Sequence, residues 1–581
     1  MFPWFVGVLA TPPDRIFGGV NRWSADYYIY LSFIETGMRG SLREYHLTST
    51  KPQEPILIHG VYTISGYLGK LIGLDSTAVY HLDRLILGGI FIGVLFFLYR
   101  SVFKRTFWAG IALLFVFCIT GFPKTLDILG RWDWRFLSWV QELNIVGRST
   151  SPPHYLLGFS LYVIAVWYFI EGRASVMKKS LILAVIMTLG TIANPVNLLI
   201  LWSTLVVYGG INAMRGMRRI GPSTSLRVKG IGRIRSEIGE LKVAFLTILW
   251  TVPIALYYQQ KLSIFPWGPR SNALKFYIPA SLPIDWKELF LALGPTLVFA
   301  IIGVGWWIAG KIRSWKMENG KCPPARLAES KRAGEAGKME DRWGLFFFSW
   351  ILVQFGLLSV SKPWGVDPLR FLQGLYYIPL AAFATVGVRE IGGIRWISPS
   401  TPSTPSTTLR TNPLGINSLR VKGIRGIGEI RVAVVVAVIS FLITLPTLIL
   451  SYREHLFMNT DYKEFASMIY PTLDQYQAYK FMEQHTPFTS GVIAYYEVTE
   501  VLPAFSGNTT ERDMSHGDKT KFFANQMSSE EALAFLKANR FSYVWLGYQE
   551  KAPGFNPALY PFLQKVFENK GVTVYKVGSR F

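Results

Sequence analysis

Apolar stretches, each about as long as a bilayer is thick, recur along this chain from Leu82 to Leu450. The hydrocarbon core of a membrane needs about 17–25 apolar residues per helix. The run 180–211 is too long for one span, and Asn194-Pro195 near its middle predicts two short helices joined by a tight turn. We expect further spans over 82–103, 107–122, 153–171, 242–260, 289–310, 343–360, 371–388 and 431–451. The sequence therefore predicts an α-helical polytopic membrane protein with about ten spans.

The positive charge of the chain is concentrated in loops between these spans. Only 17% of the residues are charged, against about 25% in soluble proteins. The net charge of +23 arises mainly in the basic loops 212–241, 311–342 and 389–430. Loops rich in Lys and Arg stay cytoplasmic, and a charge placed in this way argues against nucleic acid as a partner. Attraction of these loops to the anionic headgroups of the lipid bilayer would follow from their charge alone.

This orientation assigns the remaining loops to the outer face. They are 14–80, 123–152, 261–288, 361–370 and everything after residue 451. The two cysteines, Cys118 in a span and Cys322 in a cytoplasmic loop, lie too far apart to pair. Residues 1–10 are apolar but too short to span, so we expect them to be the outer half of a helix whose beginning is missing from this chain. With that helix restored the number of spans would be eleven.

The C-terminal segment differs in character from the rest. We expect residues 1–455 to form the transmembrane domain and 456–581 a small soluble α/β domain on the outer, extracytoplasmic side of the cell membrane. Alternating patterns predict helices over 473–484, 532–539 and 558–569, and strands over 492–496, 541–546 and 572–577. Such alternation indicates a largely parallel sheet. No glycine-rich phosphate loop is present in the sequence, so no nucleotide cofactor is expected.

The first outer loop contains an ordered set of polar residues. A helix is expected from about Asp26 to Glu35, with Gly37 and Gly40 ending it. Its apolar residues share one face, which predicts an amphipathic helix lying along the membrane surface. Asp26 at its N-terminus would stay ionised and could serve as a general base for a hydroxyl acceptor. The alternative is that Asp26 only caps the helix.

Two other outer segments carry candidate ligands. Asp133, Glu142 and His154 are residue types that could hold a divalent metal ion, although their spacing matches no established motif and structural roles remain the alternative. Lys362 and Arg370, near the outer end of a late span, suit a phosphate group. Their alternative role is snorkelling from the span end to the interface.

In this arrangement the chain resembles the GT-C superfamily of integral membrane glycosyltransferases, especially the bacterial protein O-mannosyltransferases and the lipid A aminoarabinose transferases. The resemblance covers most of the chain in architecture. In motif it rests on Asp26-Tyr27-Tyr28, on residues 131–155 and 367–371, and loosely on 495–550. The first loop lacks the Asp-Glu pair of several branches, which leaves a second carboxylate role open.

The resemblance implies transfer of a sugar from a polyprenyl-phosphate-type donor to a glycan, lipid or protein acceptor. Asp26 would deprotonate the acceptor, and Arg370, helped by Lys362, would stabilise the departing phosphate. Glu35 or Glu54 would position the acceptor or a metal ion. The C-terminal domain would cover the cavity, with Glu497 and His516 facing the site.

Two other classes of function remain open from the sequence. A transporter or flippase for a lipid-linked or polar solute would use a broken helix such as the one expected at Asn194-Pro195. A non-catalytic membrane assembly protein would make Asp26 and Arg370 incidental.

Overall fold

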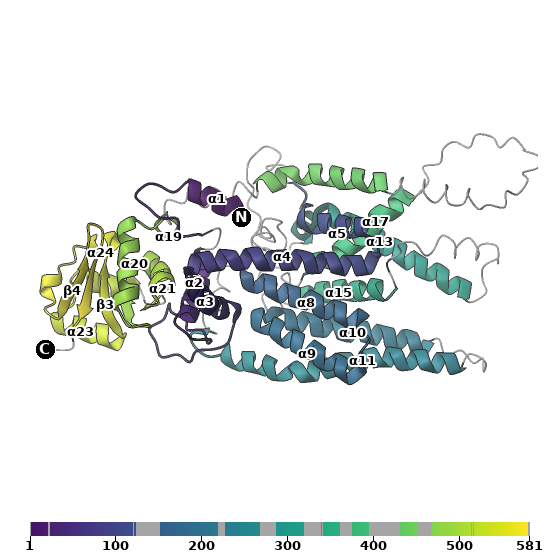
Figure 1. The fold of residues 1–581 in the computed structure, drawn as a ribbon, viewed down its shortest axis with the longest axis horizontal. Coiled ribbons are helices and arrows are strands. Elements are labelled where there is room, and N and C mark those ends of the chain that lie inside the picture. Colours follow the sequence, from purple (N-terminus) through teal and green to yellow (C-terminus); the bar gives the residue numbers. More distant parts are fainter. Residues whose placement is uncertain are drawn as a thin grey trace, which may run out of the picture.

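The fold consists of a bundle of long helices with a small sheet domain at one end (Figure 1). The computed structural model describes residues 2–20, 24–119, 121–123, 151–218, 227–267, 286–318, 339, 341–360, 375–393, 430–450, 466–512, 514 and 516–578. We refer to the end of the bundle that carries the sheet as the capped end. The short helices α1, α2 and α3 lie at this end, between the bundle and the sheet (Figure 1).

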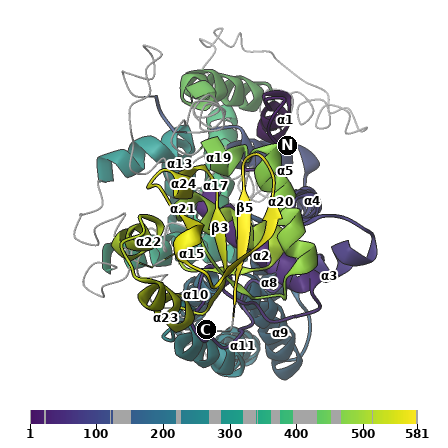
Figure 2. The same cartoon turned by 90° about the vertical axis from the view of Figure 1, so that its left-hand side faces the viewer.

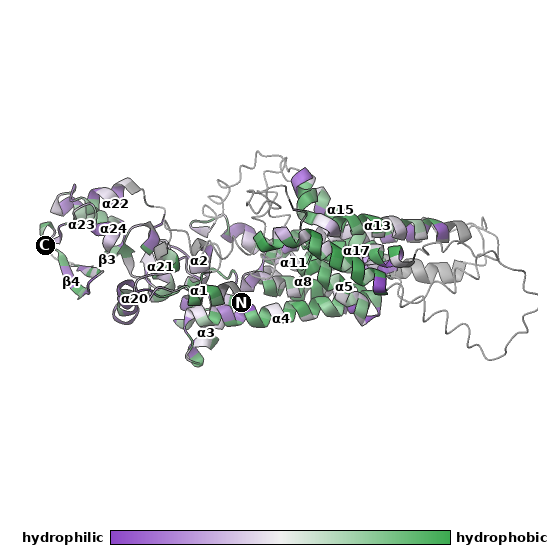
Figure 3. Cartoon of the chain, turned by 90° about the horizontal axis from the view of Figure 1, so that it is seen from above, coloured by the Kyte–Doolittle hydropathy of each residue, from purple (hydrophilic) through white to green (hydrophobic). Residues whose placement is uncertain are grey.

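The bundle contains the predicted membrane spans. Its described helices are α4 (Ser76–Phe103), α5 (Thr106–Phe117), α8 (Pro153–Glu171), α9 (Val176–Ala193), α10 (Val196–Arg218), α11 (Arg227–Lys261), α13 (Trp286–Glu318), α15 (Asp341–Val360), α17 (Tyr377–Gly393) and Ile430–Leu450. Within the described residues, eight helices are long and apolar enough to cross a membrane. The other two, α5 and α17, have 12 and 17 residues. Figure 3 shows that the bundle is mostly hydrophobic, whereas the sheet domain contains hydrophobic and hydrophilic residues side by side. The predicted polytopic helical membrane protein is confirmed.

The predicted break in the run 180–211 is also confirmed. Helix α9 ends at Ala193 and α10 begins at Val196. The backbone N–H of Asn194 still donates to the carbonyl oxygen of Gly190 at 2.8 Å. Pro195 then has no N–H to continue the ladder, so a new helix starts after it.

Residues Phe2–Leu9 form α1, and the segment 14–80 contains α2 (Ser24–Met38) and α3 (Val61–Leu71). The prediction that α2 is amphipathic, with one apolar face, is wrong. Buried residues occur all round the helix: Tyr27, Tyr28, Leu31, Ser32, Phe33, Ile34, Glu35 and Thr36. Glycines allow α2 and α3 to approach closely, since a Cβ added at Gly66 would come within 2.0 Å of the carbonyl oxygen of Ile34.

The sheet domain has five strands in the order β2-β1-β3-β5-β4. Its strands are β1 (Gly491–Ile493), β2 (Thr509–Thr510), β3 (Phe541–Leu546), β4 (Leu563–Glu568) and β5 (Thr573–Val577). Its helices are α19 (Ala466–Ile469), α20 (Leu473–His485), α21 (Tyr496–Ser506), α22 (His516–Phe523), α23 (Ser529–Ala538), α24 (Tyr548–Lys551) and the short η5 (Pro557–Leu559). A capping box precedes α23, with Ser528 and Glu531 bonded reciprocally.

Two predictions for this domain are wrong. The sheet is mixed rather than largely parallel, because β1 pairs in parallel with β2 and β3 whereas β5 is antiparallel to both β3 and β4. The expected helix 558–569 is instead η5 followed by β4. The side chain of Asn569 accepts from the N–H groups of Gly571 and Val572 at 3.1 and 2.8 Å. This asparagine turn folds β4 back as a hairpin onto β5.

The sheet domain is joined to the first outer loop by backbone hydrogen bonds. Gly18 N–H donates to Ile469 O at 2.9 Å, and Leu473 N–H to Asp14 O at 3.0 Å. At the sheet edge, Thr510 N–H donates to Leu47 O at 2.8 Å. A single apolar core joins α2 and α3 to α20, α21 and one sheet face. Viewed from the capped end, the sheet lies in front of α2 (Figure 2). The domain therefore forms one wall of the region around α2.

The buried Glu511 is a central contact of this junction. Its carboxylate accepts from Ser49 Oγ at 3.1 Å, Thr50 N–H at 3.1 Å and Thr50 Oγ1 at 3.2 Å. We expect Glu511→Gln to lower the free energy of unfolding by about 1–3 kcal/mol, because all three bonds go to Oε2 and a neutral amide oxygen is a weaker acceptor than a carboxylate oxygen. The melting temperature of the detergent-solubilised protein measures this loss. Glu530→Gln, at an exposed position in α23, should leave it unchanged; equal melting temperatures for the two variants would contradict the role of Glu511.

Candidate active site

Asp26 lies in the first turn of α2, at the capped end of the bundle. Its side chain is half-buried. The first turns of α2 contact the segment that leads into the sheet domain, because the Tyr28 hydroxyl donates to the carbonyl oxygen of Met468. Helix α21 packs against α2 as well. The positive end of the α2 dipole favours the ionised form of a carboxylate placed here.

Four tyrosines beside Asp26 join α2, α3 and α4. We call Tyr27, Tyr30, Tyr62 and Tyr80 the tyrosine cluster. Ring centroids lie 4.9 Å apart for Tyr27 and Tyr80, 6.2 Å for Tyr62 and Tyr80, and 5.0 Å for Tyr30 and Tyr62. Burial raises the pKa of Tyr27 and Tyr62 well above the usual value. Both hydroxyls therefore stay protonated and can donate hydrogen bonds at neutral pH.

A buried guanidinium lies next to this cluster. Arg84, one turn after Tyr80 on α4, is 7% exposed, and its Cζ lies 5.9 Å from the Tyr80 ring centroid. Its Nη1 lies 3.4 Å from Nδ1 of His81, while His81 Nε2 lies 3.0 Å from the carbonyl oxygen of Gly19. These contacts fit a neutral His81 that accepts at Nδ1 and donates at Nε2.

Arg84 has no carboxylate partner among the described residues. Its Nε is buried and makes no hydrogen bond within that part of the chain. A buried cation without a counter-charge is costly, so such a group is expected to have a partner in the working protein. An anionic ligand would supply that partner.

Asp26 and Arg84 act on the same tyrosine. The carboxylate of Asp26 and the guanidinium of Arg84 both interact electrostatically with the Tyr80 hydroxyl. Arg84 acts in the same way on Tyr27 and Tyr62. The carboxylate of Asp26 and the buried guanidinium of Arg84 therefore border the same cluster of hydroxyl donors.

His154, the one described member of the predicted metal set, joins this cluster. It lies in the first turn of α8, and its Nδ1 is 2.7 Å from the Tyr62 hydroxyl. Its ring centroid is 4.1 Å from that of His59, whose Nδ1 lies 2.9 Å from Ala193 O. Asp133 and Glu142 lie outside the described residues, and within these no three potential ligands gather around a metal position.

The structure places Glu35 and Glu54 in ion pairs with other residues. Glu35 is nine residues after Asp26 along α2, about 13.5 Å at 1.5 Å per residue. It pairs with Arg39 at 3.0 Å, and burial raises its pKa, an effect that Arg39 opposes. Arg39 in turn donates to the carbonyl oxygen of Glu483, so Glu35 belongs to the junction with α20. Glu54 pairs with Lys261 at 2.5 Å, and this contact lowers its pKa.

Of the remaining predicted residues, two belong to helices of the sheet domain and two lie outside the residues that the structure describes. Glu497 is in the first turn of α21, where burial raises its pKa, while Gln549 and Arg15 act in the opposite direction. His516 begins α22, and its side chain is outside the described part. Lys362 and Arg370 lie outside the described residues.

Arg84, Tyr80 and His59 were not predicted as site residues from the sequence. A usable signal was present for Arg84, because Asp83-Arg84 falls inside the apolar stretch 82–103. Ionisable residues in a span are rare and usually functional. For His59 the sequence holds no comparable signal, since its neighbours Ala193 and His154 are distant in the chain.

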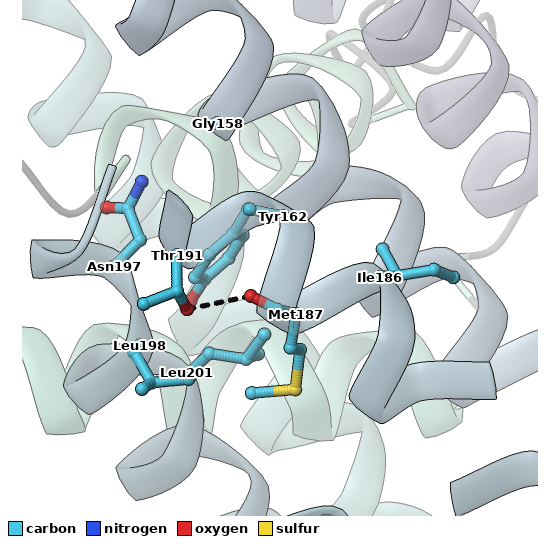
Figure 4. A pocket seen from close by; sticks show the side chains of 9 residues that line it. Gly158, Tyr162, Ile186, Met187, Thr191, Asn197, Leu198 and Leu201 are labelled. Atoms are coloured by element: carbon cyan, nitrogen blue, oxygen red, sulfur yellow. Dashed lines mark hydrogen bonds between the residues drawn. The ribbon is translucent and has the colours of Figure 1, made fainter. Parts of the chain in front are cut away.

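A separate cavity lies inside the bundle at the α9–α10 break (Figure 4). It is lined by Gly158, Tyr162, Ile186, Met187, Gly190, Thr191, Asn197, Leu198 and Leu201. Both amide atoms of Asn197 are buried there without a hydrogen-bond partner in the described residues.

Comparison with known proteins finds similarity among solved structures. No protein-family model matches this chain, and no curated protein matches it. The apo oligosaccharyltransferase of Archaeoglobus fulgidus is 13% identical, with a TM-score of 0.42 over 100% of this chain and 74% of that chain. ArnT from Cupriavidus metallidurans is 14% identical, with a TM-score of 0.38 over 98% and 95%. Arabinofuranosyltransferase AftD from mycobacteria is 13% identical, with a TM-score of 0.41 over 100% and 41%.

Proposed function

We propose that this chain is a membrane glycosyltransferase that takes a sugar from a polyprenyl-phosphate-type donor at the capped end of the bundle. The observation that carries this proposal is the buried Arg84, whose Nε has no hydrogen-bond partner among the described residues, beside a tyrosine cluster that begins next to Asp26. The cluster sits where α4, a helix long and apolar enough to span the membrane, begins. A donor whose tail lies in lipid and whose phosphate emerges at the surface would reach it.

In this mechanism Arg84 binds the donor phosphate. Its unpartnered Nε and the protonated tyrosine hydroxyls offer hydrogen bonds to phosphate oxygens. Charge accumulates on the phosphate as the bond to the anomeric carbon breaks, and fixed donors stabilise that charge. The apolar side chains Leu82, Leu85, Ile86 and Ile90 on α4 are exposed and would accompany the lipid tail.

Asp26 then acts as the general base. It accepts a proton from the acceptor hydroxyl or amine, whose oxygen or nitrogen forms the new bond to the anomeric carbon. The sugar–phosphate bond breaks at the same carbon, and the lipid phosphate leaves with the bonding electrons. A single displacement of this kind inverts the anomeric centre.

Lys362 and Arg370 remain proposed as further phosphate ligands, and Asp133, Glu142 and His154 as ligands of a divalent metal ion. The Nδ1 atoms of His59 and His154 already contact Ala193 O and the Tyr62 hydroxyl. Each ring can offer only Nε2 to a metal, so these two histidines supply two ligand atoms at most. We therefore derive no catalytic step through a metal, and no nucleotide cofactor is needed for a lipid-linked donor.

The test is transfer by the purified protein in lipid nanodiscs. It is incubated with a panel of polyprenyl-phosphate and polyprenyl-pyrophosphate sugars and with candidate glycan, lipid and peptide acceptors. Release of the free carrier lipid is followed by mass spectrometry. We expect acceptor-dependent release from at least one donor. Absence of release across the panel, with donor binding also absent, would overturn the proposal.

Replacement of Arg84 tests the phosphate role directly. We expect Arg84→Gln to raise the donor KM about 10- to 100-fold, since a charge-assisted hydrogen bond contributes about 1.5–3 kcal/mol. The acceptor KM should stay within about twofold. Arg100→Gln, at an exposed position near the other end of α4, is the control and should change neither value. An unchanged donor KM in a folded Arg84→Gln protein would remove Arg84 from the site.

A further inference from the structure

Helix α3 has one face packed against protein and the other face apolar and exposed. The exposed side chains are Ile64, Tyr67, Leu68 and Leu71, followed by Ile72, each between 48% and 67% exposed. We call these five residues the α3 outer face. Their spacing of three and four residues places them on one side of the helix.

The inner side of α3 cannot turn outward. Tyr62 and Thr63 are fully buried. Gly69 meets α4, where an added Cβ would lie 2.2 Å from Val79 Cγ2. Gly66 meets α2 even more closely. The orientation of α3 is therefore fixed by backbone contacts, and the outer face stays exposed in the single chain.

The outer face lies beside the exposed apolar side of α4. Helix α3 and the start of α4 occupy the same side of the molecule in two perpendicular views (Figures 2 and 3). The chain passes from α3 to α4 through only four residues, 72–75. On α4, Leu82, Leu85, Ile86 and Ile90 are exposed, as expected for the lipid-facing side of a membrane span.

The composition of α3 fits the boundary between headgroups and acyl chains. The helix contains one charged residue, Lys70, which is exposed in its last turn. A lysine at this level extends its amine to the lipid phosphates, and a tyrosine such as Tyr67 is typical of the interface. No acidic residue occurs in α3 to repel anionic headgroups.

We propose that α3 is an in-plane membrane anchor whose outer face inserts into the lipid surface at the capped end of the bundle. Interfacial helices bury their apolar side about 5–10 Å into the headgroup–acyl boundary. Tyr62 is on the opposite side of the same helix, so insertion also fixes the depth of the tyrosine cluster. If the proposed glycosyltransferase function holds, this depth places the cluster at the level of a lipid-linked phosphate.

Spin labels on single cysteines test this insertion without any need for activity. In a Cys118→Ser, Cys322→Ser background, labels are attached at Leu68→Cys and, separately, at Leu71→Cys. Reference labels are attached at Leu85→Cys on α4 and at Leu559→Cys on η5, which are 56% and 52% exposed. The proteins are reconstituted into phosphatidylcholine–phosphatidylglycerol vesicles. Relaxation enhancement by oxygen and by a water-soluble nickel chelate is then measured.

We expect the labels on the α3 outer face to prefer oxygen, as the Leu85→Cys label does, and the Leu559→Cys label to prefer the nickel chelate. A preference for the nickel chelate at both α3 positions would overturn the anchor. Exclusion of both reagents would also overturn it, because the face would then be covered by protein, such as a second copy of this chain. Loss of transfer activity alone, with the oxygen preference kept, would count against the proposed function and leave the anchor standing.

Discussion

Asp26→Asn is expected to lower the turnover number of sugar transfer by about 10²–10⁴-fold while leaving the protein folded. General base catalysis contributes rate factors of this size. The amide of asparagine is nearly isosteric with the carboxylate, so packing at the start of α2 should survive, but it cannot accept the acceptor proton. Steady-state transfer from a lipid-linked donor measures the loss. The donor KM should change little, because the phosphate is held by other groups.

Asp75→Asn is the matched control for this experiment. Asp75 is an exposed aspartate at the same end of the bundle, and its carboxylate caps α4 by accepting from Ala78 N–H at 2.8 Å. Asparagine is an equally good cap, so this variant should transfer at the normal rate. Near-normal turnover of Asp26→Asn would reduce Asp26 to a helix-terminal residue. A loss shared by both variants would indicate a general effect of removing negative charge from this surface.

The helices of the membrane domain could be predicted from the sequence because each one depends on its own local composition. A bilayer demands internal backbone bonding from each apolar segment, so length and hydropathy alone specify the spans. The break at Pro195 was predictable for the same reason, since the missing N–H is a property of that residue. Arg84 was passed over because it lies within an apolar run that reads as one continuous span.

The setting of α2 could not be predicted from its own residues. Its residue pattern fits an interfacial helix. The helix is buried because the sheet domain, more than 400 residues later in the chain, covers it. Tyr28 of α2 bonds to Met468, and in the following loop Ser49 and Thr50 bond to Glu511. The α3 outer face shows the opposite case, in which a helix that was not singled out carries the exposed apolar side. Long-range packing therefore decides that α3, and not α2, keeps an exposed apolar side.

The strand β4 was mistaken for a helix because its apolar residues suit either period. Leu563, Val566 and Phe567 follow the three- and four-residue spacing of a helix. The turn at Asn569 and the pairing with β5 decided in favour of a strand. Short apolar segments of this kind depend on the neighbour that they find.

Gly303→Val is expected to destabilise the membrane domain more than any other single change considered. Helices α13 and α17 touch through their backbones: a Cβ at Gly303 would lie 1.9 Å from Phe383 O, and one at Gly387 would lie 2.2 Å from Phe299 O. Small residues allow such close approach between membrane helices. A valine would force the two helices apart, and the obstacle is backbone, which cannot rotate away as a side chain can. Overpacking costs about 1–3 kcal/mol where neighbours can adjust, and here we expect more.

The melting temperature followed by size-exclusion chromatography of the solubilised protein measures this effect. Gly305→Val is the control on the same helix, because a Cβ at Gly305 meets nothing within 4 Å and the position is exposed. We expect Gly305→Val to elute and melt like the unsubstituted protein, and Gly303→Val to aggregate or melt at a clearly lower temperature. Since α17 directly follows the segment that carries Arg370, a displaced α17 should also reduce transfer in whatever folded fraction remains. Indistinguishable behaviour of the two valine variants would show that α13 and α17 are not in backbone contact.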